Sequence, residues 1–261
     1  MIRLVASDLD GTLLKGDAQS LQPEIFEQIR QLKEQGILFV AASGRQLFNL
    51  YNLFGPVQDE IAYIAENGCL LQYQGKVLHK EQFARSVSDA ILDELVQHTE
   101  LEIGCSGEQL YYMDTKNEEF LLWLKNKVKN NVLKVESLRQ VQEPMLKISI
   151  FKESGIEAES EFWINKFGGQ AAVVTSGYSW LDFMPLGANK GKSLQKLQQM
   201  FDIAPAECMA FGDHNNDIEM LSSVQYNYAM EEAQPAVQKL CEFHTDSVER
   251  ILAEVIAGTI K

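Results

Sequence analysis

Short apolar runs alternate with amphipathic helices along residues 2–65, and this alternation most restricts the folds open to the chain. The runs at 2–7, 37–44 and 61–68 have the length and apolar character of buried strands. Residues 23–36 and 45–54, which separate these runs, predict two helices. Strands that alternate with helices in this way predict an α/β fold with a doubly wound, mostly parallel sheet.

The pattern changes between about residues 83 and 182, where predicted helices are interspersed with hairpins. Hairpins at 101–114 and 171–185 and an alternating strand at 145–151 indicate an α+β segment with a partly antiparallel sheet. From residue 183 the alternation of helix and strand returns. We therefore predict an α/β core formed by residues 1–82 and 183–261, interrupted by an α+β insert at residues 83–182.

The charge balance excludes some partners. The chain has 37 acidic and 23 basic residues, for a formal net charge of −14. A nucleic-acid binder normally has a basic surface, and an anionic membrane surface also repels such a chain, so we expect neither partner. The first acidic residue of "MIRLVASDLD" comes at position 8, too early for the apolar region of a signal peptide. No apolar run approaches the roughly 20 residues of a membrane span, so the expected location is cytoplasmic.

The cysteines give no sign of a metal or disulfide framework. They are far apart and form no C-x-x-C spacing, so buried free thiols in a reducing compartment are expected. The four are Cys69, Cys105, Cys208 and Cys241.

Asp8 and Asp10 are the first residues that suggest chemistry. They follow the apolar run at 2–7, and side chains two apart on a strand point to the same side. Two facing carboxylates repel unless a cation lies between them, and Mg²⁺ is the natural candidate. Gly11 allows a tight turn whose N–H groups could face an anion. The alternative is an ordinary acidic turn, because Asp-Gly is a common turn pair.

Polar residues also follow other predicted strands or open predicted helices. Ser43 and Gly44 end the run at 37–44, Asn67 lies at the end of the run at 61–68, and Lys190 comes just before a predicted helix. "GDHNND" at 212–217 ends another predicted strand. Because ligands bind beyond the carboxyl ends of parallel strands, we expect these segments to form one site. A hydroxyl, a glycine N–H and a lysine ammonium are suited to phosphate.

Three of these residues are interpreted by position. Asp213 could complete a carboxylate cluster around the metal, Asn216 could donate to a phosphate oxygen, and Asp217 lies one helical turn further on. His214 is interpreted as a solvated loop residue rather than as a base or ligand.

The motifs D-x-D-G-T at 8–12, S-G-R at 43–45, N-K-G at 189–191 and G-D-x-x-N-D at 212–217, taken together, resemble the haloacid dehalogenase-like hydrolase superfamily. The best match is its Cof-type phosphatases, because "ENG" at 66–68 and "GDHNNDIEML" at 212–221 fit that subgroup. The resemblance implies a Rossmann-like core with a substrate-selecting cap at residues 83–182.

The resemblance also implies roles for individual residues. Asp8 is the expected nucleophile, and Asp10 the expected acid/base, which also lends its backbone carbonyl to the metal. Asp217 supports the site without contacting the metal. The expected Mg²⁺ ligands are Asp8, Asp10 and Asp213, and the expected phosphate-binding residues are Leu9, Ser43, Gly44, Lys190 and Asn216.

The expected function is a magnesium-dependent phosphatase that hydrolyses small phosphomonoesters, such as sugar phosphates, through an aspartyl-phosphate. A phosphotransferase or phosphomutase shares the same first step and stays open as an alternative. A non-catalytic phosphate sensor is a third possibility, but the intact set of Asp8, Asp10, Lys190 and Asp213 argues against it.

Substrate choice is expected to depend on the cap. The candidate turns lie around 106–112 and 176–182, and the candidate residues are Arg45, Tyr112 and Trp180, with Tyr178 beside them. The alternative for the aromatic residues is packing within the protein core.

Overall fold

The computed structural model describes residues 1–16, 18–175 and 178–260. The chain forms two compact units, each composed of more than one segment. Unit 1 consists of Met1–Ser43, Leu50–His79 and Asn189–Lys261, and unit 2 of Gly44–Asn49 and Lys80–Ala188.

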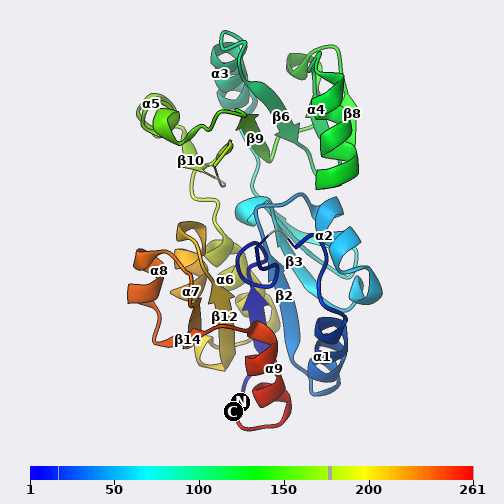
Figure 1. Ribbon diagram of the computed structural model, residues 1–261, viewed down its shortest axis with the longest axis vertical. Helices are drawn as coiled ribbons and strands as arrows, with labels where there is room; N and C mark the ends of the chain where they lie inside the picture. Colours follow the sequence, from blue (N-terminus) through cyan, green and yellow to red (C-terminus); the bar gives the residue numbers. More distant parts are fainter. Residues whose placement is uncertain (17, 176–177, 261) are drawn as a thin grey trace. The chain divides into compact units, whose positions relative to one another are not determined.

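Unit 1 contains an eight-stranded sheet in the order β14-β13-β12-β1-β2-β3-β4-β5 (Figure 1). The pairs from β14 to β3 are parallel, and β4 runs antiparallel to β3. The strands are β1 (Leu4–Ser7), β2 (Leu38–Ala42), β3 (Ala62–Ala65), β4 (Leu70–Tyr73), β5 (Lys76–Lys80), β12 (Cys208–Gly212), β13 (Tyr226–Met230) and β14 (Phe243–Thr245).

Helices cover both faces of this sheet, which confirms the predicted doubly wound architecture. On one face, Leu4, Ala6 and Val40 pack against α6 (Lys190–Phe201), α7 (Ile218–Leu221) and α8 (Pro235–Leu240). On the other face, α1 (Pro23–Glu34) and α9 (Val248–Ile256) pack together (Figure 1). The short helix α2 (Leu47–Leu53) follows β2 in the chain. Parallel strands buried between two helical layers account for the continuous apolar runs in the sequence.

Unit 2 contains a six-stranded sheet in the order β10-β11-β9-β6-β7-β8. All of its pairs are antiparallel except β7 with β8, and the hairpins β6–β7 and β10–β11 confirm two predictions from the sequence. The elements are α3 (Arg85–Leu95), β6 (Glu102–Ser106), β7 (Tyr111–Met113), α4 (Glu118–Trp123), β8 (Val132–Lys134), β9 (Lys147–Phe151), α5 (Ser160–Phe167), β10 (Ala171–Thr175) and β11 (Trp180–Pro185).

Four strands were not predicted from the sequence, namely β4, β5, β8 and β14, of which β5, β8 and β14 lie at the edges of their sheets. They are short, and β5 ("KVLHK") lacks a buried residue. A two-residue turn with Gln74 and Gly75 at φ 49° and 72° joins β4 to β5, as in tight hairpins of the type with two left-handed residues. That turn is a signal that could have predicted the hairpin.

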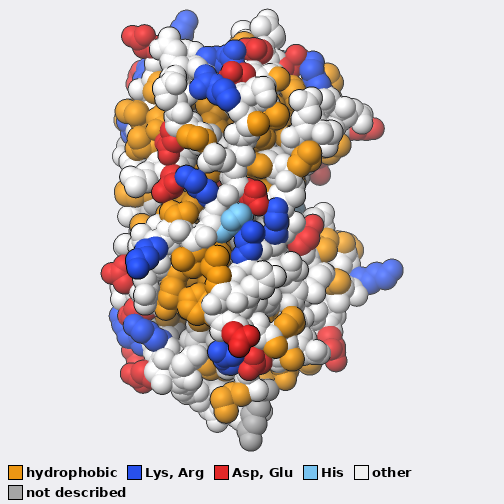
Figure 2. Space-filling model, turned by 180° about the vertical axis from the view of Figure 1, so that it is seen from behind, with side chains coloured by type: hydrophobic (Ala, Val, Ile, Leu, Met, Phe, Trp, Pro, Cys, Tyr) orange, Lys and Arg blue, Asp and Glu red, His pale blue; other side chains and the backbone are white. Residues whose placement is uncertain are grey.

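The structure also bears on the predictions about the cysteines, membrane-spanning helices and surface charge. The four cysteines are buried and free, as predicted. Within the described ranges, no helix is both long enough and apolar enough to span a bilayer. On the face shown in Figure 2, basic side chains are interspersed with acidic and uncharged side chains and do not form one continuous basic patch.

Candidate active site

The turn after β1 places Asp8 at the carboxyl edge of the unit 1 sheet. Strand β1 ends at Ser7, and the register of β1 with β12 sets Ser7 opposite Phe211. The residues that follow the two strands, Asp8 and Asp213, are therefore brought to the same edge. Gly11, at φ 86°, allows the chain to turn back at once.

Asp10 differs from Asp8 in its burial and in its place on the turn after β1. Both residues lie beyond the end of β1, so strand alternation, on which their common orientation was predicted, does not apply to them. Asp8 is buried, whereas Asp10 is exposed on the turn and forms an isolated bridge with Leu14. Leu9, between them, is fully buried, and its carbonyl accepts hydrogen bonds from the N–H groups of Thr12 and Leu14.

Lys190 is fully buried between two carboxylates. Its Nζ lies 2.5 Å from Oδ1 of Asp8 and 2.7 Å from Oδ1 of Asp217. Lys190 is the first residue of α6, and the side chain of the N-cap residue Asn189 accepts a hydrogen bond from the N–H of Lys192 at 2.7 Å. This cap defines where the helix starts and hence where the ammonium group lies.

The charges in this cluster shift the pKa values of its members. Burial raises the pKa of Asp8 well above its usual range, and the charges of Asp217 and Asp213 add to the rise, against the opposing effect of Lys190. Burial, followed by the charge of Asp217, also raises the pKa of Asp213. For Lys190, burial acts to lower the pKa, but the carboxylates of Asp217 and Asp8 outweigh it, so the pKa is raised. Lys190 therefore stays protonated.

Asp8, Asp213 and Asp217 form a carboxylate group suited to a metal ion, with one oxygen of each lying within 4.8 Å of the others. The two oxygens of Asp217 are already engaged: Oδ1 pairs with Lys190, and Oδ2 accepts the N–H groups of Asp213 and His214 at 3.1 Å. Asp8 and Asp213 are therefore the side chains left to bind a cation. Crowded carboxylates with raised pKa values fit a hard cation such as Mg²⁺, which prefers oxygen ligands.

The predicted phosphate-binding residues of unit 1 come from the loops around this edge. Ser43 is buried directly after β2, and its carbonyl accepts the N–H of Asn67 at 3.0 Å. Asn216 is half-buried in the loop after β12, and its Nδ2 donates to Oδ1 of Asn67 at 3.0 Å. Gly44 belongs to unit 2, where its carbonyl accepts a hydrogen bond from Lys147 at 2.7 Å.

Two residues at the site were assigned no individual role from the sequence, although both lie in motifs that the sequence analysis singled out. Thr12 is fully buried, and its Oγ1 donates to Oδ1 of Asp213 at 3.2 Å. Asn67, in "ENG", contacts both Ser43 and Asn216. The available signals were their positions within D-x-D-G-T and "ENG" and, for Asn67, its place at the end of a predicted strand.

Gly11 provides a test of the turn geometry. A Cβ at this position would lie 2.2 Å from Oδ2 of Asp213, and φ is 86°. Gly11→Ala is therefore expected to displace Asp213 and to reduce kcat/KM by about 10²-fold, as small misplacements in active sites do. Gly36→Ala is the control, because Gly36 has φ 75° but open space around it. The control should lower the free energy of unfolding by about 1–2 kcal/mol and leave activity unchanged. Equal activities for the two variants would contradict this role of Gly11.

Comparison with known proteins identifies the family. Residues 5–252 match the family model described as haloacid dehalogenase-like hydrolase. The chain belongs to this family. Among curated proteins it is 28% identical over 250 residues to the 5-amino-6-(5-phospho-D-ribitylamino)uracil phosphatase YbjI of Escherichia coli (strain K12), with 95% of this chain and 92% of that protein covered. It is 27% identical to the HMP-PP phosphatase of Klebsiella pneumoniae (strain 342), with 91% of this chain and 87% of that protein covered.

Solved structures agree with the fold of this haloacid dehalogenase-like hydrolase. A haloacid dehalogenase-like hydrolase from Bacteroides thetaiotaomicron superposes with a TM-score of 0.84 at 22% identity, with 98% of this chain and 100% of that chain covered. The predicted haloacid dehalogenase-like family and the predicted enzyme class, a phosphatase, are confirmed.

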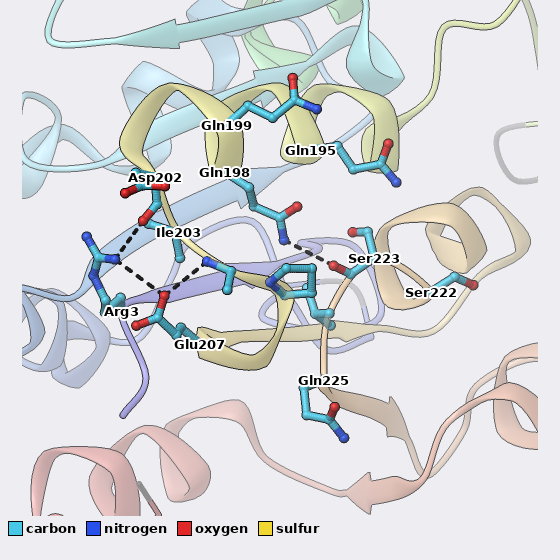
Figure 3. A pocket seen from close by; sticks show the side chains of 13 residues that line it. Arg3, Gln195, Gln198, Gln199, Asp202, Ile203, Glu207, Ser222, Ser223 and Gln225 are labelled. Atoms are coloured by element: carbon cyan, nitrogen blue, oxygen red, sulfur yellow. Dashed lines mark hydrogen bonds and ion pairs between the residues drawn. The ribbon is translucent and has the colours of Figure 1, made fainter.

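The hydrolase has a cavity of about 830 Å³ at the end of the unit 1 strands opposite the candidate active site (Figure 3). Its walls include Arg3, which precedes β1, and Glu207, which precedes β12. Arg3 pairs with Glu207 at 3.3 Å, and Gln198 donates to the carbonyl of Ser223 at 3.0 Å. None of the predicted catalytic or phosphate-binding residues lines this cavity, so it is not the candidate active site.

Two of the three aromatic residues proposed for substrate choice in this hydrolase pack within unit 2, where Tyr112 is buried and Trp180 half-buried. Tyr112 is buried in a cluster with Ile148 and Trp163, and its hydroxyl donates to Glu143 at 2.6 Å. Trp180 packs against Phe151, with 5.0 Å between ring centroids. These contacts favour the alternative of core packing.

The remaining candidates for substrate choice lie in loops. Arg45 donates to Oδ1 of Asn49 at 3.1 Å, and the exposed Tyr178 donates to the carbonyl of Ser154 at 2.7 Å. Ser176, at the start of the second candidate turn, lies outside the described residues.

Proposed function

We propose that this protein is a magnesium-dependent phosphatase that hydrolyses small phosphomonoesters through an aspartyl-phosphate on Asp8. The observation that supports this most is the contact between Lys190 and Asp8. One oxygen of Asp8, Oδ1, is held at 2.5 Å by a buried ammonium group, and within the described ranges no donor contacts Oδ2. A carboxylate fixed through one oxygen presents the other as an oriented nucleophile.

In the first step, Oδ2 of Asp8 attacks phosphorus and the bond from phosphorus to the leaving oxygen breaks. The electron pair of that bond goes to the leaving oxygen, which takes a proton from the carboxyl group of Asp10. The products are an aspartyl-phosphate, a free alcohol and the carboxylate of Asp10. The exposure of Asp10 on the turn agrees with a group that exchanges protons with substrate and water.

In the second step, the carboxylate of Asp10 takes a proton from water as the water oxygen forms a bond to phosphorus. The bond between phosphorus and Oδ2 breaks, which releases inorganic phosphate and restores the carboxylate of Asp8. Asp10 ends the cycle protonated, as it began, so the proton count balances.

The phosphoryl oxygens need positive partners. Lys190 supplies a permanent charge, and Ser43, Gly44, Asn216 and the loop at Leu9 supply hydrogen-bond donors. Mg²⁺ held by Asp8, Asp213 and the Asp10 carbonyl would neutralise further phosphate charge. Asp217 keeps Lys190 and the loop at Asp213 in place through its three hydrogen bonds.

For the substrate we propose small phosphorylated metabolites such as sugar phosphates. The two curated relatives are named for different phosphorylated metabolites. The family relationship therefore supports small phosphorylated metabolites as the class of substrate rather than any single compound. We further propose that unit 2 selects among substrates. One face of its sheet contains a buried polar cluster in which Asp182 pairs with Lys147 at 3.3 Å and accepts from Ser149 at 2.6 Å. Polar groups of this kind suit hydroxyl groups on a leaving group.

Phosphate release tests the proposal directly. Sugar phosphates, nucleotides, a phosphorylated ribitylaminopyrimidine and an aryl phosphate are to be compared with and without Mg²⁺. Removal of divalent ions with a chelator is expected to lower the rate on the order of 10²-fold or more, because the carboxylate cluster then repels the substrate. Readdition of Mg²⁺ should restore the rate. Full activity in chelator would contradict the metal role, and transfer to an added sugar rather than to water would favour the phosphotransferase alternative.

A further inference from the structure

The loop Glu66–Gly68 after β3 has no role in the mechanism above, yet its backbone is unusual. All three of its residues have positive φ: 51° for Glu66, 54° for Asn67 and 97° for Gly68. Such angles are uncommon for residues other than glycine, and asparagine is among the few that tolerate them. Backbone of this kind tends to occur at functional sites, where surrounding contacts maintain it.

This loop contacts three of the four segments that hold predicted phosphate-binding residues, namely those with Ser43, Asn216 and Lys190. The N–H of Asn67 donates to the carbonyl of Ser43 at 3.0 Å, and Nδ2 of Asn216 donates to Oδ1 of Asn67 at 3.0 Å. A Cβ on Gly68 would lie 2.2 Å from the carbonyl oxygen of Asn189, the N-cap residue before Lys190. The side chain of Asn67 is therefore held at the junction of these loops.

One half of the Asn67 amide is engaged and the other is not. Only 2% of the residue is exposed, and Oδ1 accepts from Asn216. The buried Nδ2 has no hydrogen-bond partner within the described ranges. Buried donors are nearly always satisfied in folded proteins, so the unpaired Nδ2 points to an acceptor from outside the chain.

We propose that Asn67 is a further substrate-binding residue, whose Nδ2 donates to an oxygen of the phosphoryl group; this rests on the proposed phosphatase function. Its neighbours Ser43 and Asn216 are both predicted to bind the same group. The amide is neutral, so it adds a hydrogen bond to the dianion without adding a further charge to the cluster around Lys190. Through Oδ1 it also fixes the orientation of the Asn216 amide.

The test is the affinity for inorganic phosphate, measured by titration calorimetry with Mg²⁺ present. Asn67→Asp keeps the shape, the acceptor for Asn216 and the tolerance of positive φ, but replaces the N–H donor with an oxygen. Asn67→Gly removes the donor without adding charge and suits the same φ. Both are expected to weaken phosphate binding by about 10- to 100-fold, the range for a hydrogen bond to a charged group.

Asn52→Asp is the control for added charge, because Asn52 is exposed on α2 in the same unit and has no role in the site. It should bind phosphate as the parent does. If the parent binds phosphate and Asn67→Gly binds it equally well, the amide holds only a water molecule and the proposal is overturned. If the parent itself binds no phosphate and releases none from any ester, the proposed function fails as well, so the two failures are distinguishable.

Discussion

Asp10→Asn is expected to accumulate a covalently phosphorylated protein, whereas Asp8→Asn is expected never to acquire phosphate. Asp8→Asn lacks the nucleophilic carboxylate, so the first bond cannot form. Asp10→Asn keeps that carboxylate and its contact with Lys190. With an aryl phosphate whose leaving group needs little proton assistance, the first transfer is partly spared. The second step lacks a base to activate water, so the intermediate persists.

The measurement is the intact mass of each variant after an acid quench, where acyl phosphates persist longer than in base. Both variants should turn over at rates reduced on the order of 10²-fold or more, with the larger loss for Asp8→Asn. The parent protein, quenched in the same way, is the control for transient phosphorylation. A phosphoryl mass on Asp8→Asn would place the nucleophile elsewhere, with Asp10 and Asp213 the next residues to test.

Lys190→Met is expected to lower kcat/KM on the order of 10²-fold or more, while Lys192→Met should change it little. Lys190 is fully buried and contacts Asp8 directly, so its charge acts on the reacting carboxylate and on the phosphoryl oxygens. Lys192, two residues further along α6, provides a matched control on the same helix. Equal losses in both variants would mean that the wrong lysine has been assigned.

Lys190→Met is also expected to lower the free energy of unfolding by about 3–5 kcal/mol, because Asp8 and Asp217 then face each other without a cation. Adding Asp217→Asn removes one of these charges and should recover part of the stability but none of the activity. Urea unfolding measured beside kcat/KM separates the two effects. Recovery of activity together with stability would show that Lys190 acts only by holding the fold.

Much of unit 1 could be predicted because its signals are local. Apolar runs predicted β1, β2 and β3, since strands buried on both faces need apolar residues at every position. The order of strands and helices then predicted a parallel sheet whose carboxyl edge gathers the residues after each strand. Edge strands such as β5 escaped prediction because they bury little and so show no apolar pattern.

The relations between the site residues required the tertiary structure. Strand alternation suggested that the side chains of Asp8 and Asp10 point the same way. However, β1 ends at Ser7, one residue before Asp8, and Asp8 is buried whereas Asp10 is exposed. Likewise, no sequence pattern indicates that Asp217 uses one oxygen for Lys190 and the other for two backbone N–H groups. These hydrogen bonds depend on where three loops meet, which spacing along the chain does not determine.

The sequence by itself determined the α/β class and, through its resemblance to known hydrolases, the family and the residue types of the site. These follow from periodicity and from short motifs, each contained within a few neighbouring positions. Only the tertiary structure decided that Tyr112 packs in the core of unit 2 and that Asn67 joins Ser43 to Asn216. The physical reason is that burial and hydrogen-bond pairing arise between segments distant in the chain: the contact of Lys190 with Asp8 joins residues 182 positions apart.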